Sequence, residues 1–136
     1  MSNSRVQDEA AIQSVLVDSY QAWERGDAAG MVADYTVDAT AILTGSLRDG
    51  RDVIRNSMAL AFEGPLKGSS TTNKQLSLRF VGQDAAILVS ESGILFAGET
   101  EVPEVRKVNA TWVFEKRDDE WMIAAYHNSP VLAPPR

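Results

Sequence analysis

The chain has 136 residues, of which 44% are hydrophobic and 24% charged, and its formal net charge is −6. This length predicts a single domain over residues 1–136 that can bury a core. The negative charge argues against nucleic acid as a partner, because phosphate groups are bound by clustered lysines and arginines. The absence of cysteine excludes disulfides, thiolate metal sites and cysteine nucleophiles.

No apolar signal segment follows the N-terminus, and no apolar run approaches the roughly 20 residues of a membrane-spanning helix. We therefore expect a cytoplasmic protein without a membrane partner. The sequence carries no metal-ligand cluster and no Gly-x-Gly-x-x-Gly motif after a predicted strand. The segment Gly45–Gly50 has two glycines at phosphate-loop spacing, but Arg51-Asp52 replaces the Lys-Ser/Thr pair. These observations predict a protein without a metal or cofactor.

Three helices are predicted in the first half of the chain. Six residues at spacings of three and four share one face of a first helix, which ends at Gly26. Asp27 is expected to cap a second, short helix that continues to Tyr35. A third helix lies between Asp52 and Gly64. The stripe on the first helix comprises Ile12, Val15, Leu16, Ser19, Tyr20 and Trp23.

Alternating polar and apolar residues predict five strands, over residues 39–44, 72–81, 85–96, 105–114 and 121–128. Helices followed by consecutive strands are typical of an α+β fold. We expect three N-terminal helices packed on a strongly curved, mostly antiparallel sheet. Such a sheet wrapped over a long helix forms a cone, and its open end is a natural pocket.

Four segments then carry a resemblance to a known superfamily: Trp23–Asp27, Tyr35–Ala39, Gly50–Ile54 and Trp121–Ser129. The chain resembles the nuclear transport factor 2-like superfamily, the cone fold of ketosteroid isomerases, scytalone dehydratase and SnoaL-type polyketide cyclases. Within it, the chain is similar to the SgcJ/EcaC-type group of bacterial secondary metabolism, which includes enediyne clusters. This resemblance implies an apolar, polyketide-like ligand in the cone. The oxidoreductase label often given to the group has no support in this sequence.

The only histidine, His127, lies in the last predicted strand. Ideal alternation places it on the face of Trp121, Ile123 and Ala125, so we expect its ring at the cavity wall. An imidazole there could transfer a proton near neutral pH. The alternative is a structural histidine that is hydrogen-bonded in the core.

Two further residues are candidate catalytic groups. Tyr20, by analogy with ketosteroid isomerases, could stabilise an enolate, although core packing is the simpler interpretation of its place on the helix stripe. Glu91 is the one charge in the strand over residues 85–96, and burial would raise the pKa of its carboxyl. It could face the cavity or a subunit interface, or pair with Arg79 or Arg106.

Six more residues are expected to contact a ligand: Trp23, Tyr35, Asp38, Ile42, Asn109 and Thr111. Trp23 would form part of the wall, and Asp38 is either a turn cap or a carboxylate at the cavity mouth. Asn109 and Thr111 face the cavity if Trp112 and Phe114 face outward. The outer face of the sheet would then be too apolar for solvent, which predicts a homodimer through that face.

The leading functional hypothesis is an enzyme or accessory enzyme of bacterial secondary metabolism. It would perform cofactor-independent isomerisation, cyclisation or dehydration on an apolar intermediate. The alternative is a non-catalytic ligand-binding protein or dimeric scaffold of the same pathway. A second titratable group near a ring nitrogen of His127 would favour the enzyme, because a general base is usually oriented by a partner.

Overall fold

The computed structural model describes the backbone of residues 2–132 and the side chains from Arg5 to Leu132. Its helices are α1 (Ser2–Glu24), α2 (Ala28–Met31) and α3 (Arg51–Glu63), with a 3-10 turn, η1, at Glu104–Arg106. Its strands are β1 (Tyr35–Leu43), β2 (Ser46–Asp49), β3 (Ser70–Phe80), β4 (Ala85–Leu95), β5 (Val108–Arg117) and β6 (Glu120–Pro130). The expected α+β architecture is confirmed.

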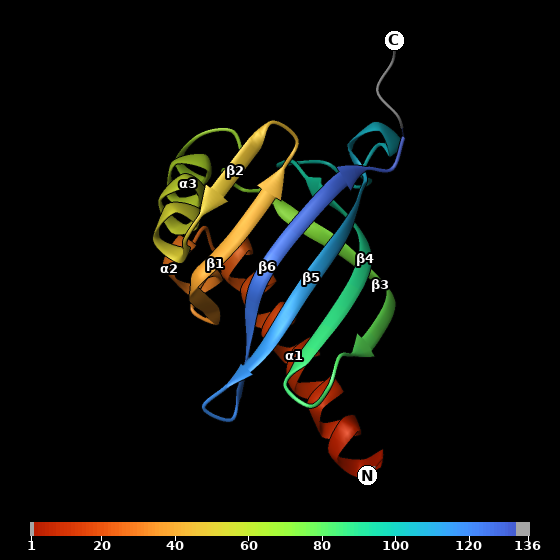
Figure 1. Ribbon diagram of the computed structural model, residues 1–136. Helices are drawn as coiled ribbons and strands as arrows, with labels where there is room; N and C mark the ends of the chain where they lie inside the picture. The colour runs from red at the N-terminus through yellow and green to blue at the C-terminus, as the bar shows by residue number, and fades with distance from the viewer. Residues whose placement is uncertain (1, 133–136) are drawn as a thin grey trace.

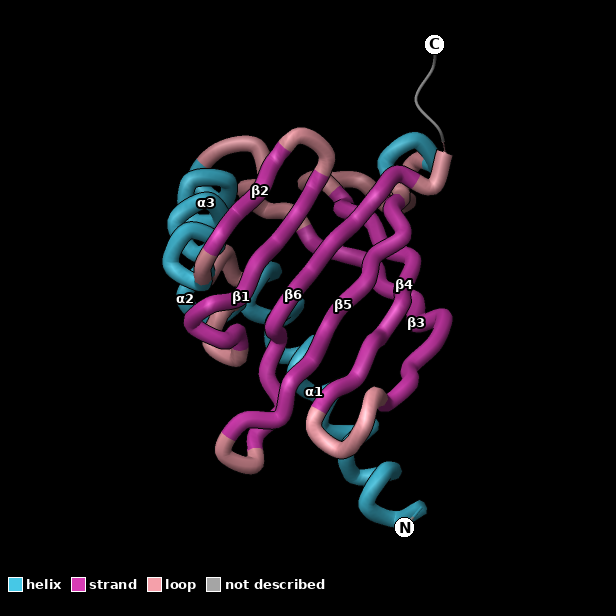
Figure 2. Tube along the Cα trace, in the orientation of Figure 1, coloured by secondary structure: helices cyan, strands magenta, loops and turns pink. Residues whose placement is uncertain are grey.

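The strands form one sheet in the order β2-β1-β6-β5-β4-β3. Only the β1–β6 pair is parallel, and the other four pairs are antiparallel. The sheet curves around α1, while α2 and α3 lie beside its β1–β2 edge (Figures 1 and 2). The sheet and helices thus enclose a cone. No helix in the described part of the chain is both long and apolar enough to cross a membrane.

The chain reverses sharply between α1 and α2. Gly26 has a φ of +68°, a left-handed conformation that glycine adopts without a steric penalty. Asp27 then caps α2 as expected, since its Oδ1 accepts a hydrogen bond from the Gly30 backbone N–H at 2.9 Å. The predicted length of α2 is wrong, because Tyr35 begins β1 rather than ending the helix.

The segment predicted as a turn between two glycines contains the short strand β2. Gly45, with a φ of +75°, makes the reversal that pairs β2 with the end of β1. Because β2 has only four residues, its alternation is too brief to distinguish a strand from a turn. The missed strand matters because it carries Arg48.

A β-bulge determines which side chains of β6 face inward. Ala124 is an extra residue in the β5–β6 ladder, without a partner in β5. Before it, Trp121 and Ile123 face α1; beyond it, Tyr126 and Asn128 take the inward positions. A one-residue insertion reverses the alternation of all following side chains.

The core lies between α1, α3 and the concave face of the sheet. Trp112 and Phe114 of β5 are buried in it, at 3% and 0% exposure. The alternative in which these rings face outward is therefore wrong. Other fully buried core residues are Ile12, Ile54, Leu88 and Ile123.

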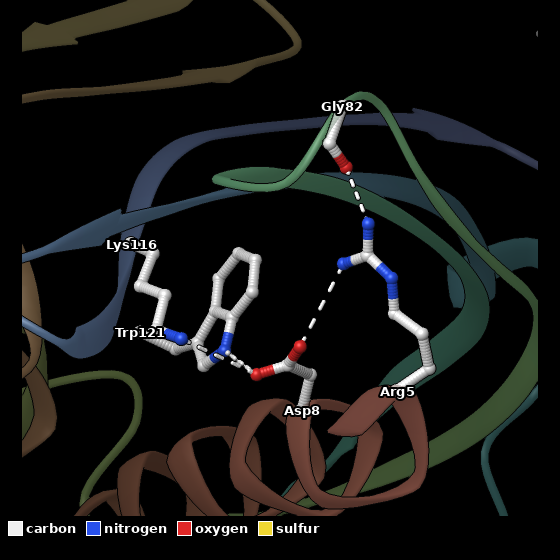
Figure 3. A network of polar contacts seen from close by, with 5 residues as sticks. All are labelled: Arg5, Asp8, Gly82, Lys116 and Trp121. Atoms are coloured by element: carbon white, nitrogen blue, oxygen red, sulfur yellow. Dashed lines mark hydrogen bonds and ion pairs between the residues drawn. The ribbon is translucent and has the colours of Figure 1, made fainter. Parts of the chain in front are cut away.

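Polar contacts join the start of α1 to the β3–β4 and β5–β6 turns (Figure 3). Asp8 accepts a hydrogen bond from Trp121 Nε1 at 2.9 Å, and its carboxylate lies 3.7 Å from Lys116 and 3.6 Å from Arg5. Arg5 also donates to the Gly82 carbonyl at 2.7 Å. We call this part of the cone, held by Arg5, Asp8 and Trp121, the closed end.

Candidate binding cavity

The opposite part of the cone, here called the open end, contains a cavity of about 350 Å³. Its walls come from the last turns of α1, from α2 and α3, and from all six strands. Its lining residues are Ser19, Tyr20, Trp23, Met31, Tyr35, Ala41, Leu43, Arg48, Ile54, Met58, Leu66, Thr71, Ser92, Gly93, Ile94, Phe96, Arg106, Val108, Trp112, Tyr126 and Asn128. Apolar and aromatic side chains predominate, as in most small-molecule sites.

Aromatic rings in mutual contact form much of the wall. Trp112 packs edge-on against Tyr20, with ring centroids 6.1 Å apart, and in a tilted arrangement against Tyr126, at 4.3 Å. Trp23 packs edge-on against Phe62 at 5.4 Å. Its indole N–H is already bound by Ser69 Oγ at 2.9 Å. The wall therefore presents fixed aromatic surface on which an apolar ring can pack.

Three phenols line the cavity, and all remain protonated at neutral pH. Burial raises the pKa of Tyr20, Tyr35 and Tyr126, and repulsion from Tyr126 adds to the rise for the other two. Tyr20 donates to Asn73 Oδ1 at 3.3 Å, and Tyr126 Oη accepts from Asn128 Nδ2 at 2.8 Å. The phenols are therefore hydrogen-bond donors for an oxygen atom and poor bases.

Two arginines are the only charged residues in the described lining. Arg48, on β2, donates to Met58 Sδ at 3.3 Å. Arg106, on η1, lies over the Phe96 ring at 4.2 Å from its centroid, and its Nη2 contacts the Glu99 carboxylate at 2.6 and 2.7 Å. Both charged groups of the lining are thus cationic, and Glu99, from outside the lining, neutralises one of them.

His127 does not reach this cavity, so its expected place at the wall is wrong. Its side chain is exposed on the outer face of the sheet, where the residue pairs with Thr111 and with Ile42. The bulge at Ala124 is the cause, because it moves His127 to the face opposite Ile123.

Three predicted site residues are brought together in the cavity: Tyr20, Trp23 and Tyr35. Tyr20 and Trp23 come from the last two turns of α1, and Tyr35 is the first residue of β1. Tyr35 is also a core residue, at 2% exposure, so packing and cavity lining coincide there.

Asn109, Thr111 and Ile42 lie on the outer face, where their side chains are exposed, so their predicted place in the cavity is wrong. Ala110, Trp112 and Phe114 occupy the inward positions of β5. Alternation along the strand therefore turns Asn109 and Thr111 outward. Asp38 is exposed near the start of β1, where it forms an ion pair with Arg117 at 3.2 Å. It does not line the cavity either.

Glu91 is half-buried on the outer face of β4, opposite Lys74 of β3. It lines a separate surface cleft with Lys107, Glu101 and Glu104 rather than the cavity. Among the described side chains, neither Arg79 nor Arg106 forms an ion pair with it. The interpretations of Glu91 as a cavity acid and as a partner of either arginine are not supported by this geometry.

Outside the α1 stripe, sequence reasoning missed eight polar or aromatic lining residues: Arg48, Thr71, Ser92, Phe96, Arg106, Trp112, Tyr126 and Asn128. The alternation in β5 left two possibilities open: either Asn109 and Thr111 or Trp112 and Phe114 face the cavity. The signal for Tyr126 and Asn128 was hidden by the bulge. Within residues 5–132, no group of three or more His, Cys, Asp and Glu side chains is arranged to hold a metal ion.

This cone of helices and curved sheet is the nuclear transport factor 2-like, or cystatin-like, fold. Residues 12–134 match the SnoaL-like domain, and the chain belongs to that family. A comparison with curated protein sequences gave no match.

Three solved structures illustrate the likeness. A Nostoc punctiforme domain of unknown function with a cystatin-like fold is 27% identical, with a TM-score of 0.86, covering 93% of this chain and 79% of its own. A Streptomyces avermitilis protein, provisionally named a dehydratase of the NTF2-like family, is 23% identical, with a TM-score of 0.74 over 95% of this chain and 99% of its own. A Novosphingobium aromaticivorans protein, provisionally named a scytalone dehydratase, is 15% identical, with a TM-score of 0.79 over 97% and 89%.

Proposed function

We propose that the protein binds an apolar, ring-containing small molecule in the cavity at its open end. The observation that carries this proposal is the aromatic wall formed by Tyr20, Trp112 and Tyr126 around a cavity of about 350 Å³. Burying a ring against these faces removes apolar surface from water on both sides. The protonated phenols offer hydrogen bonds to a carbonyl or hydroxyl oxygen of the ligand.

Calorimetric titration with 2-naphthol, a neutral two-ring probe, tests the proposal. Leu43→Trp places a larger side chain into the cavity, and we expect it to abolish binding. Leu60→Trp is the matched control, since Leu60 is 72% exposed on α3, and it should bind like the parent. Equal binding by both variants would show that the probe does not occupy the cavity, and no binding by the parent would count against the proposal itself.

The pathway is part of the same proposal. The sequence resemblance to the SgcJ/EcaC-type group supports a polyketide-like intermediate of bacterial secondary metabolism as the natural ligand. Native mass spectrometry after incubation with extracts of a producing culture would identify a retained compound by its mass. Retention of only fatty acids or detergents would argue against a polyketide ligand.

A second candidate function is cofactor-independent dehydration or isomerisation, which the provisional names of the two dehydratase-like structures support. In this cavity the chemistry would depend on Tyr20, whose O–H would exchange its long hydrogen bond to Asn73 Oδ1 for one to a developing oxyanion. Neither an imidazole nor a carboxylate is among the described lining residues, so no protein base is positioned there. This is why binding is the preferred proposal.

Turnover of a retained compound separates the two candidates. If the protein is an enzyme, Tyr20→Phe should lower the rate strongly, because the variant keeps the ring and loses the donor. His127→Ala should leave the rate unchanged, because His127 lies on the outer face. A compound that is bound but never converted supports the binding function.

A homodimer through the outer face of the sheet is also proposed, on grounds different from those first expected. Ile42 and Leu47 are paired across β1 and β2 and are 41% and 67% exposed on this face. Ile87, Val89 and Val113 continue the same face across β4 and β5. Sedimentation should show a dimer at micromolar concentration, and Ile42→Glu should convert it to monomer; a parent that is monomeric would exclude the dimer.

A further inference from the structure

The two cavity arginines have unused hydrogen-bonding capacity. In the part of the chain that the structure describes, the hydrogen bond of the Arg48 side chain goes to the sulfur of Met58, at 3.3 Å. A thioether is a weak acceptor, and a guanidinium group has five N–H donors. Arg48 therefore lacks the oxygen acceptor that a guanidinium in a largely apolar cavity normally has.

The Arg106 side chain contacts Glu99 on one side and lines the cavity on the other. Its Nη2 is bound by Glu99, whose carboxylate also accepts from the Phe96 backbone N–H at 2.7 Å. Its Nε is buried and has no acceptor among the described residues. Buried N–H groups without a partner are rare in folded proteins, so the internal contacts of this guanidinium are incomplete. Glu99 binds Nη2 from outside the lining, while another part of the Arg106 side chain lines the cavity.

The lining of the cavity is electrostatically one-sided. It contains Arg48 and Arg106 and, within the described residues, no Asp, Glu or His. The nearest acid to Arg106, Glu99, lies on the loop outside the lining. A neutral ligand would leave both guanidinium groups short of acceptors, whereas an anionic oxygen would satisfy them with charge-assisted hydrogen bonds.

We propose that the ligand is an aromatic carboxylate, with its rings against Tyr20 and Trp112 and its carboxylate bound by Arg48 and by the part of the Arg106 side chain that lines the cavity. This inference rests on the proposed function, because it assigns the chemical class of the molecule bound in the same cavity. It makes Arg48 and Arg106 the specificity-determining residues. The Tyr126 phenol, whose oxygen accepts from Asn128, is then left to donate to a second oxygen of the ligand.

Calorimetry with 2-naphthoate and 2-naphthamide tests the charge directly, because the two probes have the same ring system and nearly the same shape. The parent protein should bind the carboxylate roughly tenfold or more tightly than the amide, as expected for a charge-assisted pair. The preference should also fall as salt is raised, since counterions screen an anion approaching an open cavity.

Variants identify the residues responsible. Arg106→Gln and Arg48→Gln should each reduce the preference for the carboxylate and leave binding of the amide nearly unchanged. Arg79→Gln, on the outer face of β3, removes the same charge far from the cavity and should keep the preference. Glu99→Gln distinguishes binding from loop support. It should bind the carboxylate at least as tightly as the parent if Arg106 contacts the ligand, and should resemble Arg106→Gln if Arg106 only holds the loop.

The outcomes separate this inference from the proposed function. Equal affinity for the two probes would overturn the carboxylate assignment and leave apolar binding intact. Failure of 2-naphthoate, 2-naphthamide and 2-naphthol alike would overturn both. If Arg106→Gln melts far below the parent, its binding data cannot be interpreted, and the test rests on Arg48→Gln. A retained preference for the carboxylate in Arg48→Gln would then overturn the assignment of carboxylate recognition to the two arginines.

Discussion

At the closed end of the cone, side chains from α1, β5 and β6 fill the space between helix and sheet, whereas at the open end the same elements leave a cavity of about 350 Å³. One stripe of α1 serves both ends. Ile12 is completely buried in the core, and Tyr20, two turns later, lines the cavity. The polar groups differ in the same way: Asp8 is surrounded by donors, whereas the buried Nε of Arg106 has no acceptor.

This difference indicates a division of labour within one domain. Close packing at the closed end supplies much of the stability, because buried apolar groups there lose contact with water and gain neighbours on every side. At the open end the aromatic surface is kept in place by the fold but retains free area. Substitutions should therefore affect stability at one end and ligand binding at the other.

The same substitution at the two ends gives the largest expected contrast. Ile123→Ala, at a completely buried position of the closed half, should lower the free energy of unfolding by about 3–5 kcal/mol, because it leaves a cavity in a close-packed core. Ile94→Ala, at the cavity wall, should lower it by about 1 kcal/mol, because that side chain already borders empty space. Urea denaturation measures both values. Similar losses in the two variants would contradict the division of labour.

Gly93 connects the open end to the loop that carries Arg106. A Cβ atom at Gly93 would lie 2.5 Å from Val102 Cγ1, so in Gly93→Ala either the Val102 side chain or the loop that carries it must move. We expect a loss of about 1–3 kcal/mol from overpacking, together with weaker binding of a cavity ligand. Adding Val102→Ala should restore most of both, since it removes the overlapping methyl groups. A double variant no better than Gly93→Ala would show that the loop is not what Gly93 accommodates.

The polar network of the closed end should contribute less than the packing. Asp8→Ala removes the acceptor of the Trp121 indole N–H and should cost about 1–2 kcal/mol in thermal or urea denaturation. Asp8→Asn keeps an oxygen acceptor and loses the charge, so its cost should be about 0.5 kcal/mol, because Arg5 and Lys116 are partly solvated and lie 3.6 and 3.7 Å away. An equal cost for both variants would show that the ion pairs with Arg5 and Lys116 dominate instead of the hydrogen bond.

The sequence was sufficient to predict the fold because its strongest signals are periodic and local. The stripe from Ile12 to Trp23, the Gly26-Asp27 break and the alternation in the long strands each follow from the geometry of helices and strands. The residues of α1 that line the cavity were found for the same reason. Position on a helix face depends only on spacing, and no bulge interrupts α1.

The sheet side of the cavity could not be predicted in this way. Alternation in a strand defines two faces but does not say which one faces inward, so Asn109 and Thr111 were assigned to the wrong side of β5. In β6, a single extra residue at Ala124 exchanged His127 with Tyr126 and Asn128. A bulge depends on pairing with the neighbouring strand, which the local sequence does not encode.

Asp34 gives the smallest and most specific test, because it lies where β1 joins the closed half. Its carbonyl accepts from the Ile123 N–H at 2.8 Å. Burial raises the pKa of its carboxyl, and repulsion from Asp18 and Glu120 adds to the rise. A raised pKa means that the native state binds the proton more tightly than the unfolded state, so this contribution to stability is complete below the unfolded pKa of about 3.9 and is lost as pH rises through the native pKa.

At pH 7 the charged carboxylate of Asp34 is therefore unfavourable, and Asp34→Asn should raise the melting temperature. The gain should be about 0.5 kcal/mol or less, because the side chain is largely solvated. As the pH falls about one unit below the unfolded pKa, the parent carboxyl becomes protonated in both states, so the two melting temperatures should converge. Asp84→Asn removes an equal charge from the exposed β3–β4 turn and serves as the control for net charge. A gain of the same size in that variant, or one that persists at low pH, would show that the repulsion among Asp34, Asp18 and Glu120 is not its source.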